Sequence, residues 1–283
     1  MRRQKLILLV LGLLVGGVGG ICFWWQWDSD SRQFIPPVPN FIDSGSDKKK
    51  GEQILAEYKE QFEAHLEEHG NPMFALFSEI KFLDYSSLGI RPDDTVADLG
   101  AGVGTLAMSM LYQRIPFAKL YSLDINPYSL KFLDYALERH PWEHPERVET
   151  VNSLRTDVTL PADSVEILFI VEVPAIYFAL TQSGDYIASP AALADMKRLF
   201  ATIDKALTAD GELHFIYPVT TPTSGECNPE ELISALAEIG FDHVATRRLL
   251  LGVDNYYLVF RPPESTAPPG PRPGWNPTAR SLP

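Results

Sequence analysis

The sequence predicts an α/β protein whose core is a doubly wound, mostly parallel sheet of seven strands. Strand-like and helix-like segments alternate from residue 94 to residue 260, which is typical of a parallel sheet covered by helices on both faces. Residues 165–171 are largely apolar, as expected of a strand buried on both faces. A glycine-rich turn follows the first strand, where sheets of this kind bind their ligands.

The expected elements follow from apolar periodicity and from start and stop signals. Pro127 opens one helix, and Gly70 and Gly240 end two others. Helices are expected at residues 52–69, 71–88, 104–113, 127–139, 190–207 and 229–239, and strands at residues 94–99, 119–125, 147–151, 165–171, 212–217, 243–251 and 255–260.

The N-terminus has the features of a membrane anchor. Residues 6–25 carry no charge, and 20 residues are enough to cross a bilayer as a helix. An aromatic cluster from Phe23 to Trp27 follows, as at a membrane–water interface. A cleaved signal peptide is the alternative, but the apolar run is long for one and no Ala-x-Ala site follows it. We therefore expect a single uncleaved transmembrane helix within residues 1–27.

The charges around this helix predict its orientation. Three basic residues lie within the first five positions, and the first charged residues after the apolar run are mostly acidic. The positive-inside rule then places the N-terminus in the cytoplasm and the large domain outside, although so short a signal also leaves the reverse orientation open. Gly12, Gly16 and Gly20 have the spacing that allows two membrane helices to pair, which would give a weak dimer.

The remaining chain divides by composition. Residues 28–50 are polar and contain several prolines, as in a flexible tether. Residues 51–90 are expected to form a helical lid, and residues 91–262 the α/β domain. Residues 263–283 are rich in proline and have no apolar periodicity, so we expect a disordered tail.

Composition excludes several classes of function. The chain has 37 acidic and 24 basic residues and a net charge of −13, so it has no long-range attraction for nucleic acid. Cys22 lies in the apolar run and leaves Cys227 as the one thiol of the folded part, which excludes a disulfide framework and a cysteine-rich zinc site. His65 and His69 lie one helical turn apart, but no third ligand motif follows, and no metal is expected.

The glycine-rich turn lies in the stretch VADLGAGVGT, residues 96–105. Gly100, Gly102 and Gly104 allow the backbone to turn sharply and to approach a ligand closely. The helix that follows presents free N–H groups. Asp124 ends the next strand, 20 residues after Gly104, where an acid can accept both hydroxyls of a ribose. The ligand should therefore contain a nucleoside.

The spacing of the glycines and one further acid indicate which nucleoside is bound. The dinucleotide fingerprint is G-x-G-x-x-G, whereas here the third glycine comes one residue early and Thr105 follows it. Asp98 lies two residues before the first glycine and would repel a pyrophosphate but attract a cation. S-adenosylmethionine carries a ribose, a sulfonium and an amino group but no phosphate, so we expect it as the cofactor.

These motifs resemble those of the class I S-adenosylmethionine-dependent methyltransferases, a superfamily with a Rossmann-like sheet. VADLGAGVGT resembles the first motif of the superfamily, and YSLDIN, residues 121–126, resembles the second. LPADSVEILFI and LTADGELHFI resemble the segments that enter the fourth and fifth strands. The resemblance covers about residues 52–262 and is greatest to small-molecule-type bacterial members, some of which carry an N-terminal export or anchor segment.

The resemblance implies which residues bind the cofactor. Asp124 would bind the ribose, with Ile125 and Asn126 beside the adenine. Asp157 is a substitute for the acid that often reaches the adenine edge, because the chain has Asn152-Ser153 in place of the usual pair. The methionine moiety would be lined by Asp98, Gly100, Ala101, Gly102 and Gly104.

The acceptor side departs from the family pattern. Glu172 keeps the acid at the end of the fourth strand, but Pro174-Ala175 replaces the aromatic–histidine pair. Methyl transfer does not require a base, because the sulfonium is already activated and the enzyme mainly holds the acceptor in line. The residues expected in the catalytic pocket are Glu172, Tyr177 and Tyr186, with Tyr58 and Phe62 in a lid above them.

Three functions remain open at this point. The first is methyl transfer from S-adenosylmethionine to a small-molecule or lipid-like acceptor near a membrane. The second is a non-catalytic, membrane-anchored nucleoside-binding or scaffold protein; the missing histidine suggests it, and so does an outward-facing domain, which would lack a cofactor made in the cytoplasm. The third is a nicotinamide oxidoreductase, against which the glycine spacing argues.

Overall fold

The computed structural model describes residues 48–75, 79–181, 190–221, 225–251, 254–263, 265 and 267–279. The expected membrane anchor, nearly all of the expected tether and Tyr186 lie outside the described residues. Within the described ranges, no helix is both long enough and apolar enough to span a membrane.

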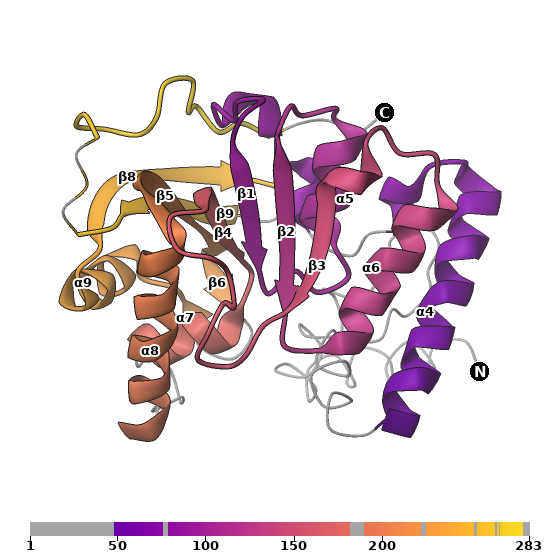
Figure 1. The fold of residues 1–283 in the computed structure, drawn as a ribbon, viewed down its shortest axis with the longest axis horizontal. Coiled ribbons are helices and arrows are strands. Elements are labelled where there is room, and N and C mark those ends of the chain that lie inside the picture. The colour runs from indigo at the N-terminus through magenta and orange to yellow at the C-terminus, as the bar shows by residue number, and fades with distance from the viewer. Residues whose placement is uncertain are drawn as a thin grey trace, which may run out of the picture.

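The central sheet has seven strands and confirms the predicted α/β, Rossmann-like class (Figure 1). The strand order is β3-β2-β1-β4-β5-β9-β8, in which β1 to β5 are parallel and β9 is antiparallel to both of its neighbours. The strands are β1 (Thr95–Leu99), β2 (Lys119–Asp124), β3 (Val148–Asn152), β4 (Val165–Val171), β5 (Leu207–Pro218), β8 (Asp242–Leu250) and β9 (Asp254–Arg261). A separate hairpin joins β6 (Thr220–Thr221) to β7 (Gly225–Glu226).

Helices cover both faces of the sheet, and each face has its own apolar core. The first core joins the sheet to α4 (Lys48–His69), α5 (Thr105–Tyr112) and α6 (Pro127–Arg139). The second core joins it to α7 (Pro174–Thr181), α8 (Pro190–Ala206) and α9 (Pro229–Ile239). Because the order of the strands reverses at β1 and β4, the carboxyl ends of these strands form the crevice in which such sheets bind ligands.

Local capping sets where the helices begin. The side chain of Asn126 accepts a hydrogen bond from the backbone N–H of Tyr128, and Pro127 occupies the first helical position of α6. Asn228 caps α9 in the same way, and Gly240 ends that helix with a φ of 111°. As a result, α6 begins immediately after Asp124 at the carboxyl edge of the sheet.

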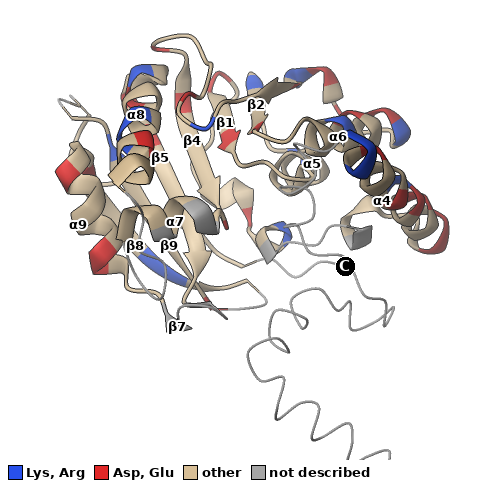
Figure 2. Ribbon diagram, turned by 90° about the horizontal axis from the view of Figure 1, so that it is seen from below, with Lys and Arg blue, Asp and Glu red and all other residues tan. Residues whose placement is uncertain are grey.

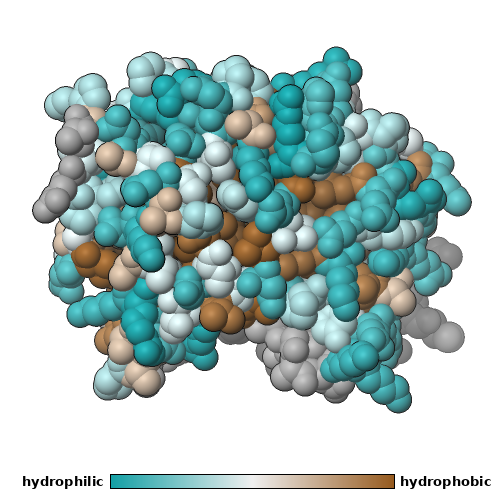
Figure 3. All heavy atoms as spheres, viewed as in Figure 1, coloured by the Kyte–Doolittle hydropathy of each residue, from teal (hydrophilic) through white to brown (hydrophobic). Residues whose placement is uncertain are grey.

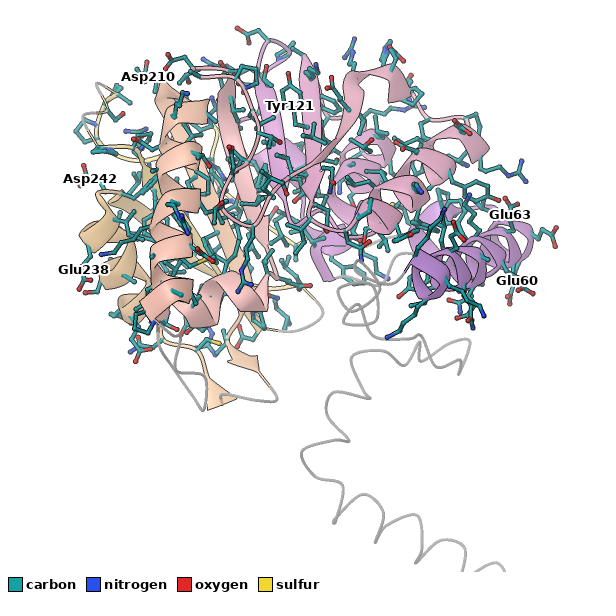
Figure 4. All side chains as sticks on the ribbon, turned by 60° about the horizontal axis from the view of Figure 1, so that its bottom comes forward. Glu60, Glu63, Tyr121, Asp210, Glu238 and Asp242 are labelled. Atoms are coloured by element: carbon teal, nitrogen blue, oxygen red, sulfur yellow. The ribbon has the colours of Figure 1, made fainter. Side chains whose placement is uncertain are left out.

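Helix α4 packs against α6 through aromatic rings, which corrects the expected role of Tyr58 and Phe62. Both side chains are 1% exposed, and both rings meet the ring of Phe132 edge to face. Glu63, which lies on the same helix (labelled in Figure 4), accepts hydrogen bonds from Tyr135 and Arg139 of α6. Tyr58 and Phe62 therefore belong to the core and do not line an open pocket from above.

Residues 71–88 do not form the single helix that we expected. The described part of this range, residues 71–75 and 79–88, has three short 3₁₀ helices, η1 (Pro72–Ala75), η2 (Glu79–Phe82) and η3 (Tyr85–Ser87). Asn71 and Asp84 accept hydrogen bonds from the backbone two residues further on, and such local bonds compete with a continuous α-helix. Helix α7 was not predicted, because its apolar residues continue the apolar run of β4 without a change of composition.

The proline-rich C-terminal residues 267–279 are ordered, so the expectation of a disordered tail is wrong for these residues. Residues 267–279, hereafter the C-terminal strap, run back across the amino edge of the sheet (Figure 1). Trp275 packs on the first core, and its ring lies 5.6 Å from that of Tyr257. Proline lacks an N–H but still accepts hydrogen bonds, so a proline-rich segment can be held by its neighbours without periodic structure.

Candidate functional site

The candidate site lies at the carboxyl ends of β1, β2 and β4, and Figure 2 views the molecule from this edge. The glycine-rich turn joins β1 to α5, and its three glycines have φ angles of 82°, 54° and 84°. The N–H groups of Gly100 and Ala101 both donate to the carbonyl oxygen of Leu123, at 2.8 and 2.9 Å. The turn is therefore tied to β2, and its left-handed conformations favour glycine.

The three glycines differ in the space beside them. A Cβ on Gly100 would lie 2.5 Å from Val173 Cγ2, and one on Gly104 would lie 2.3 Å from Leu133 Cδ1. A Cβ on Gly102 would meet only the carbonyl oxygen of Gly100, at 3.9 Å. Gly100 and Gly104 thus allow close packing, whereas Gly102 presents open backbone that a ligand can approach.

Asp124 faces the turn, as expected of a residue that binds a ribose. Its two carboxylate oxygens accept the N–H groups of Gly102 and Asn126, each at 2.8 Å. Burial raises the pKa of Asp124, and the hydrogen bonds from the backbone oppose that rise. The carboxylate is thus oriented before any ligand arrives, and each oxygen retains further accepting capacity.

Asp98 is 3% exposed and lies at the same edge of the sheet. Among the described residues, no hydrogen-bond partner of its carboxylate is found. Ser122 is its register partner on β2, and the Ser122 hydroxyl is buried with no hydrogen-bond partner in the described part of the chain. Burial, and then the charge of Asp124, raise the pKa of Asp98 to about 8. A buried acid in this state favours a cationic ligand beside it.

Two apolar side chains are exposed just after β2 and β3. Ile125 is 54% exposed and Leu154 is 57% exposed, although both are large and apolar. Ser153, the residue before Leu154, donates its N–H to the carbonyl oxygen of Asp124 and is buried, with a hydroxyl that has no hydrogen-bond partner among the described residues. An apolar surface beside one orphaned polar group suits a flat heteroaromatic ring. Asn126, also expected there, is buried and caps α6 instead of facing out.

Asp157 is held by its own turn. Its backbone pairs with that of Leu154, and its side chain accepts a hydrogen bond from the N–H of Thr159 at 2.7 Å. The turn places Asp157 after β3, on the side of the site where we expected it, but one carboxylate oxygen is already used locally. Its contact with the adenine edge stays a prediction.

Glu172 follows β4 and has a left-handed backbone, with a φ of 50°. Its N–H donates to the carbonyl oxygen of Ile216 at 2.8 Å, which fixes the chain at the crevice. A residue other than glycine in this conformation is strained, and such strain concentrates at functional sites. Val173, the next residue, contacts Gly100 and links this turn to the glycine-rich turn.

Tyr177 occupies the second core and not an open wall of the crevice. It is 2% exposed, its ring lies 4.7 Å from the ring of Tyr217, and its hydroxyl accepts the N–H of Asn228 at 3.1 Å. The geometry gives Tyr177 a structural role, holding α7 against the start of α9, and does not support its expected catalytic role. Nothing in the described residues tests that role for Tyr186.

Tyr85 is a residue at the site that the sequence did not reveal. It is fully buried, and its hydroxyl donates to the carbonyl oxygen of Ile80 at 3.2 Å. Burial, followed by the charges of Asp98, Tyr257 and Glu172, raises the pKa of this hydroxyl. No motif or periodicity marks Tyr85, because its position depends on the irregular chain between α4 and β1.

The chain is similar to several solved structures at low identity. No family model matches the chain, and no curated protein matches it. A structure of a SAM-dependent methyltransferase from Aquifex aeolicus is 14% identical, with 65% of this chain and 92% of that chain covered and a TM-score of 0.46.

Two further structures have comparable scores. The glycopeptide N-methyltransferase MtfA in complex with S-adenosylmethionine is 15% identical, over 60% of this chain and 82% of that one, with a TM-score of 0.46. The [4+2]-cyclase SpnF is 11% identical, over 62% and 77%, with a TM-score of 0.47. At these identities and TM-scores the likeness says nothing about function, which depends on the residues of the site.

Proposed function

We propose that the chain binds S-adenosylmethionine at the carboxyl ends of β1 and β2 and transfers its methyl group to a small-molecule or lipid-like acceptor. The observation that carries this proposal is the pair of acids around the glycine-rich turn. Asp124 is oriented by Gly102 and Asn126, and Asp98 is buried without a hydrogen-bond partner among the described residues.

The residues fit the cofactor group by group. The ordered carboxylate of Asp124 suits two vicinal hydroxyls, and the exposed Ile125 and Leu154 suit the faces of an adenine. The open backbone at Gly102 allows close approach, and Asp98 favours the cationic end of the cofactor. When bound, S-adenosylmethionine supplies an activated methyl group.

The same acids argue against a nicotinamide dinucleotide. Asp124 would repel a pyrophosphate at the glycine-rich turn, and a second anion there would favour the protonated form of Asp98 and leave its charge unused. The sequence also lacks the dinucleotide spacing of glycines. Titration with reduced nicotinamide dinucleotide should therefore give no saturable signal.

On the acceptor side, the proposal relies on Glu172. Its backbone conformation directs the chain across the crevice beside Gly100, and its carboxylate adds a third acid near the site. A carboxylate there can hold an acceptor amine or hydroxyl in line with the methyl group, which is most of what methyl transfer requires. We expect Glu172→Gln to reduce turnover with little change in cofactor affinity.

A non-catalytic binding protein is the second candidate. The sequence has Pro174-Ala175 where related enzymes often have an aromatic–histidine pair, and both residues open helix α7. The expected N-terminal membrane helix, and with it the outward-facing location and the weak dimer, remain part of the proposal and lie outside the described residues.

One experiment separates the two candidates. The full chain, purified in a mild detergent, is incubated with S-adenosylmethionine labelled at the methyl group and with a lipid and metabolite extract. Labelled product that disappears in Glu172→Gln supports methyl transfer. Cofactor binding without any labelled product supports the non-catalytic alternative.

A further inference from the structure

The C-terminal strap is anchored at Arg272, near its middle, by buried charges. The guanidinium of Arg272 binds Asp94, which is fully buried, at 2.6 and 3.3 Å. The backbone N–H of Arg272 donates to Glu212 at 2.9 Å, and the same carboxylate oxygen accepts from Arg261 at 2.9 Å. The strap thus supplies part of the positive charge and hydrogen bonding that two buried acids at the amino edge of the sheet require.

Beyond Arg272, the strap runs antiparallel to residues 83–89. Trp275 bridges Leu88, and the backbone N–H of Asn276 donates to the carbonyl oxygen of Ser87 at 2.6 Å. Further along, the N–H of Asp84 donates to Thr278 at 2.9 Å, and Leu83 bridges Ala279. The two segments touch so closely that a Cβ on Gly89 would lie 2.3 Å from the carbonyl oxygen of Pro273.

Residues 83–85 are held from their other side by α5. The side-chain oxygen of Gln113 accepts the N–H of Tyr85 at 3.0 Å, and its side-chain nitrogen donates to Leu83 at 2.8 Å. Gln113 ends the helix that the glycine-rich turn begins. Tyr85 is therefore clamped between the strap and the helix that leads from the candidate cofactor site.

The Tyr85 side chain lies near enough to Asp98 and Glu172 for their charges to act on its hydroxyl. It is fully buried in the first core, together with Phe169 of β4 and Tyr257 of β9, and Phe169 is the register neighbour of Asp98. Its hydroxyl donates to Ile80, so its lone pairs remain to accept a hydrogen bond. With the ionised form of Asp98, it makes a pair of acceptors, which an ammonium or another cation satisfies.

We propose that the C-terminal strap completes the cofactor site: by holding residues 83–88 in place, it positions Tyr85 beside Asp98 and Glu172, where Tyr85 forms the wall at the cationic end of the ligand. This inference rests on the proposed function. It makes Trp275 and Arg272 positioning residues, although both lie far from the cofactor site along the chain.

The test measures the affinity of the full-length chain in detergent for S-adenosylhomocysteine, which has the amino group but cannot transfer a methyl group. Trp275→Ala removes the contact of the strap with Tyr257 and with the core. Trp142→Ala is the matched control, because Trp142 is 8% exposed in the same core but its indole N–H bonds to Ala136 of α6. Thermal unfolding of each variant confirms that it is folded at the temperature of the titration.

We expect both alanine variants to unfold at lower temperature but only one to bind more weakly. Trp275→Ala should weaken the affinity at least tenfold, and Trp275→Phe should restore most of it. Trp142→Ala should change the affinity less than twofold. Tyr85→Phe, which keeps the ring and removes only the hydroxyl, should fold normally and weaken the affinity about fivefold.

Two results would overturn the inference in different ways. If the wild-type chain binds the ligand and both Trp275→Ala and Tyr85→Phe bind it equally well, the strap is structural only and this inference fails alone. If the wild-type chain has no affinity for S-adenosylhomocysteine or S-adenosylmethionine, the proposed function fails and this inference fails with it.

Discussion

Asp98 and Asp124 lie at the carboxyl ends of neighbouring strands and yet have very different surroundings. Asp124 accepts two backbone N–H groups, whereas Asp98 is buried with no hydrogen-bond partner among the described residues. A ligand-free protein that keeps such an acid gives up stability for it. This contrast suggests that Asp124 is built to orient a neutral polar group and Asp98 to receive a positive charge.

The stability of the ligand-free protein should depend on pH through Asp98. Its pKa rises from 3.8 to about 8 on folding, so the native state keeps a proton that the unfolded state releases between these values. The contribution of Asp98 to stability therefore falls as the pH rises from about 4 to 8. Asp98→Asn removes this loss and should raise the melting temperature at pH 8 by about 5 °C, with little effect at pH 4. A variant that melts below wild type at pH 8 would contradict this account.

The same residue should couple ligand binding to proton release. At pH 7, Asp98 is mostly protonated, and a cation beside it favours the ionised form. Binding of S-adenosylhomocysteine should then release up to one proton, which calorimetry detects as a heat that varies with the ionisation enthalpy of the buffer. In Asp98→Asn the residual affinity should show no such dependence. Equal proton release in wild type and variant would assign it to another group.

Among the elements, the glycine-rich turn has glycines with different roles: Gly100 allows close packing, and Gly102 leaves room for a ligand. Gly100 and Gly102 both have a positive φ, but only at Gly100 would an added Cβ meet a neighbouring side chain, 2.5 Å from Val173. Gly102→Ala should cost about 1 kcal/mol of folding stability from its backbone conformation and should block ligand approach. Gly100→Ala should cost about 1–3 kcal/mol more, because Val173 must move. Chemical denaturation and ligand titration of the two variants measure these effects side by side.

The result that would refute this division is a Gly102→Ala protein that binds S-adenosylhomocysteine as tightly as wild type. In that case the open space beside Gly102 would have no ligand in it. The turn would then be explained by strand–helix packing, for which Gly100 and Gly104 are sufficient.

The elements that could be predicted are those with a distinct sequence pattern within their own residues. Val165–Val171 was expected at the bounds it has, because a parallel strand buried on both faces is a continuous apolar run. Helix α6 was also expected as it is, from Pro127 and the amphipathic pattern after it. Helix α7 was missed, since PAIYFALT is apolar on all sides and follows another apolar run.

In the candidate site, too, the residues with a local sequence signal were predicted and those without one were not. Asp98, Asp124 and the glycines have a fixed spacing along the chain, and the structure brings them together at one edge of the sheet. Tyr85 and the C-terminal strap have no such spacing. They are held by hydrogen bonds between residues about 190 positions apart, and such contacts leave no pattern in a single sequence. Tyr177 was misjudged because an aromatic residue near a crevice can equally fill the core.

In the molecule as a whole, the two faces of the sheet are covered by different means. Helices α7, α8 and α9 cover one face, while α4, α5 and α6 share the core of the other face with residues outside regular helices. Residues 83–90 and the strap supply the remaining cover over Tyr257. Apolar side chains also gather in a band across the middle of one face of the molecule, between polar groups of the flanking elements (Figure 3). The strap is thus part of the fold, and a chain shortened to residue 262 would lose it.

Removal of the main anchor of the strap should therefore destabilise the protein. Arg272→Met leaves buried Asp94 with Arg91 as its one basic partner among the described residues, and the Arg91 side chain is 61% exposed. We expect a loss of about 3 kcal/mol in unfolding free energy, because one partner of a buried ion pair is removed. Arg248→Met is the control: Arg248 and Asp254 form an exposed pair, and its loss should cost at most about 1 kcal/mol. Urea denaturation measures the unfolding free energy of both variants. Equal losses would contradict the claim that the strap stabilises the fold.

The most direct test of the proposed function is a calorimetric titration of the full chain with S-adenosylmethionine and S-adenosylhomocysteine, beside Asp124→Ala. The account predicts one site per chain with micromolar affinity and a loss of about 100-fold or more in the variant, which keeps its circular dichroism spectrum. Absence of binding by the folded wild-type chain, or equal binding by Asp124→Ala, would contradict it.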